Sequence, residues 1–400
     1  MNDAPAPAIP HQSYASLFLR FLRFGLLAWG GPVAQIAMIR KELVDEERWI
    51  SSERFNRALA VYQVLPGPEA HELCVYFGML ARGRPGAVLA GLGFMLPGFL
   101  LMFALSWVYL SFGIRSPLVA TAFAAVQAAV IALIVRAVHR IGRGALTDRW
   151  LWVVALLSAI AQFFGVHFGI TLVFAGFAYF FCARRRYALA VAVTLACAGA
   201  ALAYVMHFDP TLAVKSEAPA ALRTPGLLEL FVSGLKAGLL TFGGAYTAIP
   251  FLRRDAVVTG AWMTDAQFLD GLALSGTLPA PLIIFATFVG YVGGGPWGAV
   301  LVTVGIFLPA FGFTLIGHDF FERVTRNEPV HKVLDGVTAG VVGLIATAAI
   351  VLFREGIRTA PAVGIFAAAI MALYLWRSKW AVLAVVLGSA AVGLLVDVRN

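Results

Sequence analysis

The stretch Arg23-Phe-Gly-Leu-Leu-Ala-Trp-Gly-Gly-Pro32 recurs in the second half of the chain as Lys236-Ala-Gly-Leu-Leu-Thr-Phe-Gly-Gly-Ala245. The same alignment, continued without a gap, pairs further residues: Arg40 with Arg253, Trp49 with Trp262, Phe55 with Phe268, Pro66 with Pro279 and Pro68 with Pro281. A hydrophobic chain whose halves carry matching segments interrupted by Gly and Pro is typical of secondary transporters. The duplication therefore predicts a transport site near the interrupted segments.

Composition places this chain in a membrane. Of its 400 residues, 60% are hydrophobic and 13% are charged, and the mean hydropathy is +0.86. In a soluble protein about a quarter of the residues are charged. The apolar residues form continuous runs of about 20, the length that crosses ~30 Å of hydrocarbon as a helix. These features predict an all-α polytopic membrane protein surrounded by the lipid bilayer.

The net charge of +9 belongs to the loops of such a protein. Basic residues gather in short segments between apolar runs, at 136–149, 184–186 and 323–332. This pattern is typical of cytoplasmic loops and does not indicate nucleic-acid binding. The distribution of Lys and Arg favours an N-terminus inside and a C-terminus outside. The segment 40–57 carries charges of both signs and is expected to form an amphipathic interfacial helix.

The apolar runs predict the number of membrane spans. In the first half they lie at 17–37, 56–81, 86–111, 117–138, 149–165, 168–182 and 187–207. In the second half they lie at 227–249, 266–292, 297–317, 332–353, 361–376 and 380–396. The span 187–207 has no counterpart, so seven crossings separate each element from its copy and the second repeat is inverted. We therefore predict two inverted (antiparallel) repeats of about six transmembrane or broken helices, joined by one extra helix, with about 13 spans. This count changes if 56–81 and 266–292 are re-entrant.

The same pattern predicts the domain organisation. A polar N-terminal tail covers 1–16, the first repeat 17–182, a connecting helix with a polar linker 183–226, and the second repeat 227–396. The tail lacks the short apolar core and cleavage pattern of a signal peptide, so no cleavage is expected.

Paired glycines interrupt the first span of each half. Gly30 and Gly31 precede Pro32, and Gly243 and Gly244 occupy the matching positions. Each glycine in a helix costs ~1 kcal/mol relative to alanine, and proline lacks a backbone donor. Broken backbone at membrane depth is tolerated where it is buried in protein or lines a cavity. We expect both breaks to border the substrate; the alternative is a tight crossing of helices through small residues.

A Pro-x-Pro sequence interrupts a later span of each half, as Pro66-Gly67-Pro68 and Pro279-Ala280-Pro281. It ends one half-helix and begins another, whose first N–H groups and positive dipole end are unpaired. Facing a cavity, such an end binds anions, and two of them would meet near the bilayer centre. The alternative is a kink without a ligand. Neighbouring polar side chains are candidate donors to the same anion: Gln63, Ser275 and Thr277.

Two basic residues at equivalent positions, Arg23 and Lys236, lie at or inside the first span of each half. A charge inside a span is expensive and normally faces the bundle interior or a wet path. If both side chains point inward they favour an anionic substrate. The alternative is that they extend toward the lipid headgroups.

A titratable cluster directly follows Pro68. Glu69, His71 and Glu72 have no counterparts after Pro281, where Leu282, Ile283 and Ile284 stand. Carboxyl and imidazole groups in a partly buried setting exchange protons near neutral pH, so these three residues are proton-coupling candidates. The alternative is a solvated mouth of the cavity.

Signatures of catalysis are missing from the sequence. It has no Walker A, GxSxG or HExxH motif and no Cys/His pair at metal-ligand spacing. Cys74, Cys182 and Cys197 lie in apolar runs and are expected to be small buried hydrophobes. We expect no enzyme, cofactor or metal, and transport driven by an ion gradient or the membrane potential.

The interrupted segments also carry a resemblance. Phe24-Gly-Leu-Leu-Ala-Trp-Gly-Gly-Pro-Val-Ala-Gln-Ile36, Trp49-Ile50 and Gln63-Val-Leu-Pro-Gly-Pro-Glu-Ala-His71 resemble the signature of the chromate ion transporter family. Thr241-Phe-Gly-Gly-Ala-Tyr-Thr-Ala-Ile-Pro250 and Leu278-Pro-Ala-Pro281 resemble its C-terminal copy. The likeness covers about residues 17–395. Ala280 departs from it, because that position often holds Gly, and this puts the second half-helix end in doubt as a ligand site.

The resemblance implies a bacterial inner-membrane protein that exports chromate, confers chromate resistance and draws on the proton-motive force. It also implies about thirteen spans in antiparallel repeats. The distribution of Lys and Arg adds the orientation, with the N-terminus cytoplasmic and the C-terminus periplasmic. Our sequence hypothesis is an alternating-access carrier that binds a tetrahedral oxyanion between the two Pro-x-Pro ends. Sulfate has nearly the shape and charge of chromate and stays open as substrate. A passive anion channel and a chromate-reducing membrane enzyme are the other classes, and a homodimer is left open.

Overall fold

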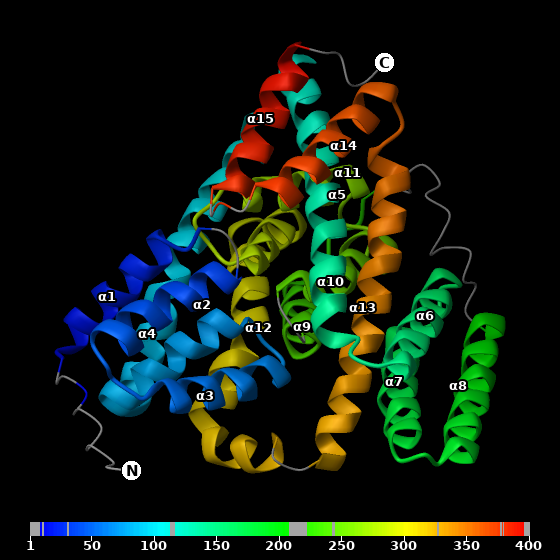
Figure 1. Cartoon of the computed structure of the whole chain (residues 1–400). Coiled ribbons are helices and arrows are strands. Elements are labelled where there is room, and N and C mark those ends of the chain that lie inside the picture. The colour runs from blue at the N-terminus through cyan, green and yellow to red at the C-terminus, as the bar shows by residue number, and fades with distance from the viewer. Residues whose placement is uncertain are drawn as a thin grey trace.

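The computed structural model describes residues 9, 12–29, 32–112, 117–207, 222–241, 245–325, 328–376, 378 and 380–395 (Figure 1). All regular structure in these ranges is helical, as the composition predicts. The first half contains α1 (Tyr14–Leu26), α2 (Pro32–Arg40), the π-helix η1 (Lys41–Glu46), α3 (Ser52–Val64), α4 (Glu69–Phe112), α5 (Pro117–Ala145), α6 (Arg149–Phe163), α7 (Phe168–Ala183) and α8 (Tyr187–His207). The second half contains α9 (Leu227–Leu239), η3 (Ala245–Ala248), α10 (Ile249–Arg253), the π-helix η4 (Arg254–Thr259), α11 (Asp265–Gly276), η5 (Leu282–Ile284), α12 (Phe285–Thr325), α13 (Glu328–Gly356), α14 (Ala360–Leu375) and α15 (Ala381–Leu395).

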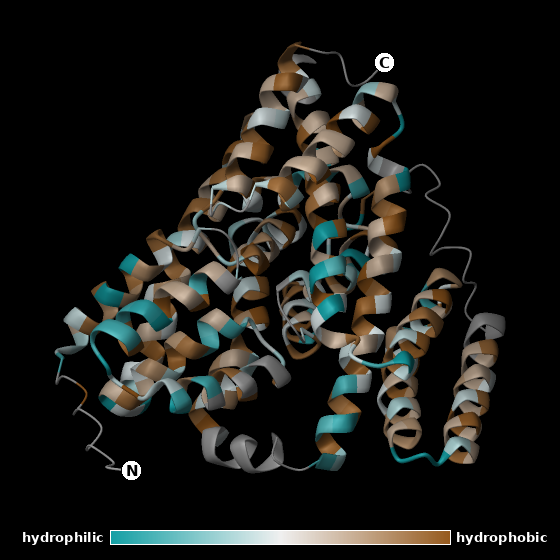
Figure 2. Cartoon of the chain, in the orientation of Figure 1, coloured by the Kyte–Doolittle hydropathy of each residue, from teal (hydrophilic) through white to brown (hydrophobic). Residues whose placement is uncertain are grey.

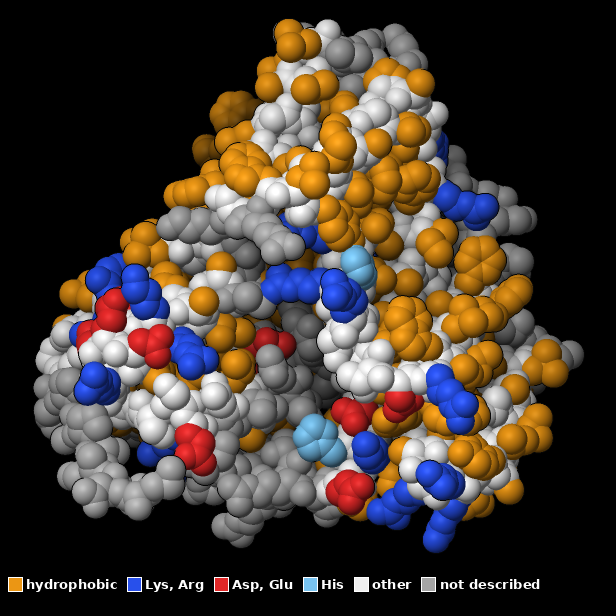
Figure 3. Space-filling model, viewed as in Figure 1, with side chains coloured by type: hydrophobic (Ala, Val, Ile, Leu, Met, Phe, Trp, Pro, Cys, Tyr) orange, Lys and Arg blue, Asp and Glu red, His pale blue; other side chains and the backbone are white. Residues whose placement is uncertain are grey.

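Long apolar helices and an apolar outer surface make this a membrane protein. Four helical segments have the length and composition to cross a bilayer: Glu69–Phe112, Thr121–Ala145, Leu282–Gly317 and Glu328–Arg354. The apolar segments of α6, α7, α8, α14 and α15 are shorter. Hydrophobic side chains cover the outside of the short helices, where Leu195 of α8 is 67% exposed (Figures 2 and 3). Apolar surface of this extent belongs against lipid.

Both predicted kinds of interruption are present. The span expected at 56–81 is divided between α3 and the start of α4, with residues 65–68 between them, and that at 266–292 is divided after α11. The helices α1 and α9, of 13 residues each, end just before the glycine pairs. Thirteen residues of helix cover ~20 Å, less than the ~30 Å of hydrocarbon. Each half therefore contains half-helices of the predicted kind.

The two halves share unusual backbone conformations at equivalent positions. The π-helices η1 and η4 occupy positions that the repeat alignment pairs. Just after each of them one residue adopts positive φ, Arg48 at 54° and Ala261 at 50°. Glycines with φ near 60°, Gly83 and Gly295, kink α4 and α12. Positive φ is disfavoured by a β-carbon, so its occurrence at both non-glycine positions marks one duplicated turn.

Two stretches differ from the sequence expectation. Residues 40–57 do not form one amphipathic helix: they comprise the end of α2, the π-helix η1, a turn and the start of α3. The wider turn of η1 carries Glu42 to basic side chains of α1. The basic stretch 136–149 is not a loop either, because α5 continues as helix to Ala145. Arginine is a good helix former, and no proline interrupts that stretch.

The repeats exchange their last helices. Helices α6 and α7 pack on α13 of the second half, whereas α14 and α15 pack on α5 of the first half (Figure 1). Within each half, α1 packs on α4 and α9 on α12, and α4 and α12 contact each other at the centre. In Figure 1 the colour gradient shows that α5 descends while its counterpart α13 rises. Each half therefore depends on the other to cover its α5 or α13 helix.

Glycine allows the closest of these contacts. A β-carbon on Gly238 of α9 would lie 2.4 Å from the carbonyl oxygen of Ile306 in α12. At the equivalent position of the first half, a β-carbon on Gly25 would lie 2.4 Å from the carbonyl oxygen of Phe94. Both clashes are with backbone, which cannot rotate away. The short helices therefore approach the long ones as closely as backbones allow.

Gly238→Ala is expected to lower the free energy of unfolding by about 1–3 kcal/mol, since the added methyl group overpacks the α9–α12 contact. Thermal unfolding of the purified protein in detergent measures this change. Gly199→Ala is the matched control, because a β-carbon on Gly199 of α8 meets nothing within 4 Å. The control is expected to retain or raise stability, and equal stability of both variants would contradict the close packing.

Candidate substrate site

The interrupted segments of the two repeats contact each other. Gly67 donates its backbone N–H to the carbonyl oxygen of Thr241 at 2.8 Å. Gly67 lies between α3 and α4, and Thr241 follows α9, at the start of the first break of the second repeat. The breaks of the two repeats are thus hydrogen-bonded to each other. Four predicted site residues fall outside the described part of the chain: Gly30, Gly31, Gly243 and Gly244.

A cavity lies where the first break of the first repeat meets the second break of the second repeat. It measures about 120 Å³. From the first repeat, it is lined by Trp29 and Pro32, which precede and follow the glycine pair in the sequence. From the second, Ser275, Leu278 and Ala280 line it, at the end of α11 and the following Pro-x-Pro sequence. Each first break therefore adjoins the second break of the other repeat.

Equivalent contacts hold each Pro-x-Pro segment against the long helix of the other repeat. A β-carbon on Gly67 would lie 3.3 Å from the β-carbon of Ala310 in α12. A β-carbon on Gly98 of α4 would lie 2.5 Å from that of Ala280. Gly67 also has φ of 151°, and a β-carbon there would lie 2.8 Å from Oε1 of Glu72. Glycine is therefore required at position 67 and not at position 280, which explains the departure seen in the sequence.

The two Pro-x-Pro ends differ in local structure. After Pro68, α4 begins as a long helix, and His71 and Glu72 donate their N–H groups to the Pro68 carbonyl at 2.9 and 3.1 Å. The earlier N–H groups of that helix have no partner within it. After Pro281 the chain forms only the three-residue η5 before α12. The first repeat therefore offers the better-formed helix end.

Two of the polar side chains before the second break already donate hydrogen bonds to backbone carbonyl groups. Ser275 donates its hydroxyl to the Leu272 carbonyl at 2.8 Å, and Thr277 donates to the Leu274 carbonyl at 2.7 Å. An anion would have to displace these bonds to receive either proton. The side chain of Gln63 lies outside the described part of the chain. All three stay predictions as ligands.

The titratable cluster is buried rather than solvated. The His71 and Glu72 side chains have 0% exposure and Glu69 has 9%. The His71 ring lies 4.9 and 4.8 Å from the ring centroids of Phe307 and Phe311 in α12. Neither carboxylate oxygen of Glu72 has a hydrogen-bond partner among the described residues. An ionised carboxylate is costly in such a setting unless it is paired.

The equivalent basic residues Arg23 and Lys236 form equivalent ion pairs. Arg23 pairs with Glu42 of η1, and Lys236 pairs with Asp255 of η4 at 2.5 Å. The repeat alignment pairs Glu42 with Asp255 as well. Each ion pair ties a half-helix to the π-turn that follows it and neutralises the basic charge. Substrate contact by Arg23 and Lys236 stays a prediction, and the pairs give both residues a structural role.

Lys236→Ala is expected to lower the free energy of unfolding by about 2 kcal/mol, because it leaves Asp255, with 11% side-chain exposure, without its cation. This is below the ~3–5 kcal/mol of a fully buried pair, because the Lys236 side chain is 34% exposed. Thermal unfolding in detergent gives the value. The double variant Lys236→Ala/Asp255→Ala should recover most of the loss; additive losses would exclude the ion pair as the cause.

The arginines nearest the meeting breaks come from α5. Arg136 and Arg140 line the 120 Å³ cavity together with Tyr246. The charge of Arg140 also acts on Glu69. The surface is hollowed between the α1–α3 side and α5, with Lys and Arg gathered at its edge over α5, and the C-terminal half of that helix is hydrophilic (Figures 2 and 3). Sequence reasoning assigned these arginines to a loop; their spacing of four residues places them on one face of a continued helix.

Among the described residues, no three His, Cys, Asp or Glu side chains lie close enough to hold a metal ion. The site combines the N-terminal end of α4, Arg136 and Arg140 of α5, and the buried carboxyl groups of Glu69 and Glu72. These groups surround the place where the helix breaks of the two repeats meet. In an apolar helical chain this is the arrangement of a membrane transport protein. The chain belongs to the chromate transporter family, whose model matches residues 15–181 and again residues 228–394.

Curated relatives match the chain over nearly its whole length. The chain is 58% identical over 400 residues to a chromate transport protein of Pseudomonas aeruginosa, covering 99% of this chain and 95% of that one. It is 31% identical to a chromate transport protein of Cupriavidus metallidurans, covering 96% and 94%. It is 28% identical to a probable chromate transport protein of Synechococcus elongatus, covering 90% of each. No solved structure matches the chain.

Proposed function

We propose that this protein is a secondary transporter that exports chromate across the bacterial inner membrane at the expense of the proton-motive force. The observation that carries the proposal is the cross-repeat meeting of helix breaks beside buried carboxyl groups and the arginines of α5. The names of the full-length relatives support chromate as the substrate.

The anion is proposed to bind where the breaks meet. The N-terminal end of α4, after Pro66-Gly67-Pro68, supplies N–H groups and the positive end of the helix dipole. Arg140 and Arg136 supply the charge that a dianion needs, in the place first expected for Arg23 and Lys236. The glycine pairs at 30–31 and 243–244 allow close backbone approach. Ser275, Thr277 and the segment 279–281 complete the opposite wall.

Proton coupling is proposed to run through Glu69, His71 and Glu72. Glu69 interacts with Arg140, so an anion that competes for that arginine changes how readily Glu69 holds a proton. Such competition links anion binding to protonation without a direct contact between them. Glu72, one turn further along α4 and fully buried, is placed to carry the proton while the site is closed.

We propose an inverted arrangement of the two repeats, with about thirteen crossings, a cytoplasmic N-terminus and a periplasmic C-terminus. The opposite directions of α5 and α13 in Figure 1 support the inversion. The exchange of the last helices gives α5 and α13 equivalent neighbours: α14 and α15 pack on α5, and α6 and α7 pack on α13. Such a pair can rock about its shared centre, which is the motion alternating access requires.

Chromate uptake into everted membrane vesicles tests the proposal. Vesicles that contain the protein are expected to accumulate chromate when energised and to lose this accumulation with an uncoupler. Uptake that never exceeds equilibrium would favour the passive anion channel. Accumulation of sulfate but not of chromate would identify a sulfate carrier instead.

A further inference from the structure

Two carboxyl groups and a hydroxyl group form a row on the first turns of α4. Glu69, Glu72 and Tyr76 follow one another at spacings of three and four residues, which places them on one face of the helix. Glu69 has 9% exposure, Tyr76 has 2% and Glu72 has none. At one end of the row the charge of Arg140 acts on Glu69. The row therefore leads from an arginine of the 120 Å³ cavity along a buried face of α4.

A buried tyrosine of α3 packs against the other end of the row. Tyr62 has 1% exposure, and its ring centroid lies 5.9 Å from that of Tyr76. Glu72 and Tyr76 both act electrostatically on the Tyr62 hydroxyl, and Thr314 of α12 lies beside it. Three hydroxyl side chains, from α3, α4 and α12, are therefore gathered within electrostatic reach of Glu72.

This hydroxyl cluster extends to the protein surface at the start of α3. Arg54 donates a hydrogen bond from Nε to the Tyr76 hydroxyl at 3.1 Å. Arg54 is exposed, as are residues 51–53 before it. A guanidinium group only donates, so the Tyr76 oxygen accepts this bond and its own proton can be donated to another group. The cluster thus connects the surroundings of Glu72 with solvent.

The second repeat forms the same packing without these groups. Gly78 and Gly290 are equivalent, because a β-carbon on either would lie 2.4 or 2.3 Å from the carbonyl oxygen of the glycine eight residues later. Two residues before them stand Tyr76 and Phe288, and Phe288 is fully buried. The segment 282–285 after the second Pro-x-Pro sequence has no titratable side chain. The fold therefore does not require a hydroxyl or carboxyl group at these positions.

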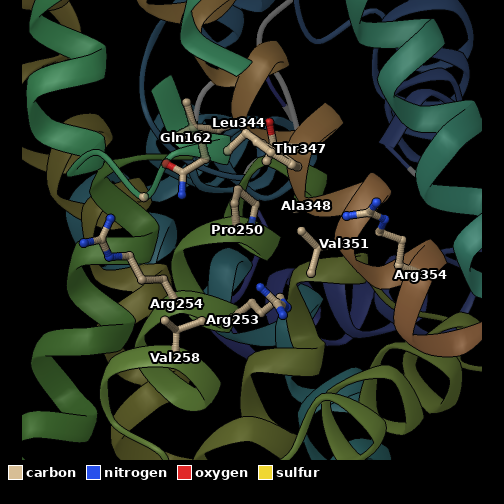
Figure 4. Close-up of a pocket in the computed structure, with 12 residues that line it drawn as sticks. Gln162, Pro250, Arg253, Arg254, Val258, Leu344, Thr347, Ala348, Val351 and Arg354 are labelled. Atoms are coloured by element: carbon tan, nitrogen blue, oxygen red, sulfur yellow. The ribbon is translucent and has the colours of Figure 1, made fainter. Parts of the chain in front are cut away.

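The cavities of the two repeats differ in the same sense. A cavity of about 130 Å³ lies on α13, beside the α10–η4 segment and the end of α6 (Figure 4). Thr347 and Val351 line it at the spacing at which Arg136 and Arg140 line the cavity on α5. The carboxyl groups of α4 and the arginines of α5 therefore occur together in the first repeat and are both replaced in the second.

We infer that Tyr62 and Tyr76 relay protons between Glu72 and the exposed surface at Arg54, by a route separate from the anion cavity. This inference rests on the proposed function. In the inward direction, a hydronium ion at the surface gives a proton to the Tyr76 oxygen, and the Tyr76 hydroxyl proton passes to Tyr62. The Tyr62 hydroxyl proton then passes to the Glu72 carboxylate. Each tyrosine ends with one proton, so the net result is one proton moved from water to Glu72, and release follows the reverse order.

Glu72 interrupts the relay in this structure. Neither of its carboxylate oxygens has a hydrogen-bond partner among the described residues. Its Oε1 atom faces the first Pro-x-Pro segment, 2.8 Å from the place of a β-carbon on Gly67. Rotation of the Glu72 side chain toward Tyr62 completes the relay. The carboxyl group thus exchanges its proton with the surface in one position and lies beside the helix breaks in the other, which prevents a continuous proton leak.

Removal of one hydroxyl at a time tests the relay. In energised everted vesicles, Tyr62→Phe and Tyr76→Phe are each expected to lower the initial rates of chromate uptake and of the accompanying proton efflux about tenfold. A pH-sensitive dye records the proton efflux. The loss is smaller than that expected for replacement of Glu72, because water can partly take the place of a hydroxyl. Tyr291→Phe, at a buried tyrosine of α12, is the matched control and should leave both rates unchanged.

Exchange of labelled for unlabelled chromate, without a proton gradient, separates a relay from packing. It needs no net proton transfer, so Tyr62→Phe and Tyr76→Phe should retain it at the native rate. Equal losses of exchange and of energised uptake would overturn the inference, because altered packing would then be the cause. Native energised uptake in both variants, with uptake by Glu72→Gln slowed, would also overturn it and leave the proposed function intact. Absence of chromate accumulation by the unaltered chain would reject the proposed function itself, and the relay with it.

Discussion

Glu72→Gln is expected to lower the initial rate of energised chromate uptake about a hundredfold, the scale on which positioned proton-transfer groups act. The uptake that remains is expected to be insensitive to an uncoupler. Glu72 is fully buried, and its carboxylate oxygens have no partner among the described residues. Glutamine preserves the shape of the neutral acid but cannot release a proton. The substitution therefore removes the coupling chemistry while keeping the packing against α12.

The comparison of three variants makes this result specific. Glu72→Gln should unfold at the temperature of the unaltered chain, because an amide replaces a neutral acid. Glu69→Gln should have a smaller effect, since Glu69 keeps 9% exposure whereas Glu72 has none, and the charge of Arg140 acts on Glu69. Glu46→Gln, at an exposed carboxylate of η1, should be neutral. Coupled uptake by Glu72→Gln at the native rate would exclude Glu72 as the proton carrier.

Much of the fold could be predicted because duplication and breaks are local properties of the sequence. Pro66-Gly67-Pro68 cannot continue a helix, and α3 and α4 are separate helices on either side of it. The kink at Gly83 lies between the spans predicted at 56–81 and 86–111. The alignment of the two halves also identified positions that share a role, such as Arg23 and Lys236.

Which elements pack together could not be predicted in the same way. Every helix of one repeat has an equivalent in the other, so the sequence alone does not distinguish α6 packing on α5 from α6 packing on α13. The structure shows the second arrangement. The carboxylate partners of Arg23 and Lys236 were missed for a different reason. Glu42 and Asp255 lie on π-helical turns, which no sequence pattern indicated.

The 120 Å³ cavity that Arg136 and Arg140 line was missed because a hydropathy analysis ends a span at the first charged residues. Arg136 and Arg140 follow an apolar run, and the rule that places basic residues in cytoplasmic loops assigned them to solvent. Helix α5 instead continues through both arginines and places them at the cavity beside the breaks of both repeats, where Arg140 is exposed. Charged residues that line a cavity beside apolar helices are the usual sign of a functional path, and the i, i+4 spacing was the available signal.

Arg140→Gln is expected to lower kcat/KM for chromate uptake about a hundredfold, from loss of one charge-assisted contact to the anion, which is worth ~1.5–3 kcal/mol. Arg140 lines the cavity where the breaks meet, and its charge acts electrostatically on Glu69. Its removal therefore weakens anion binding and uncouples binding from protonation at the same time. Initial rates in energised everted vesicles, over a range of chromate concentrations and external pH, measure both effects.

Two further variants decide between a site residue and a surface charge. Arg143→Gln removes a second exposed arginine, three residues further along α5, which unlike Arg140 does not line the cavity, and it should leave uptake unchanged. If Arg140 acts through Glu69, the pH dependence of uptake should change in Arg140→Gln, and adding Glu69→Gln should cause little further loss, because coupled residues are not additive. Equal, small losses in Arg140→Gln and Arg143→Gln would mean that the basic face of α5 serves orientation in the membrane, and that the anion crosses elsewhere.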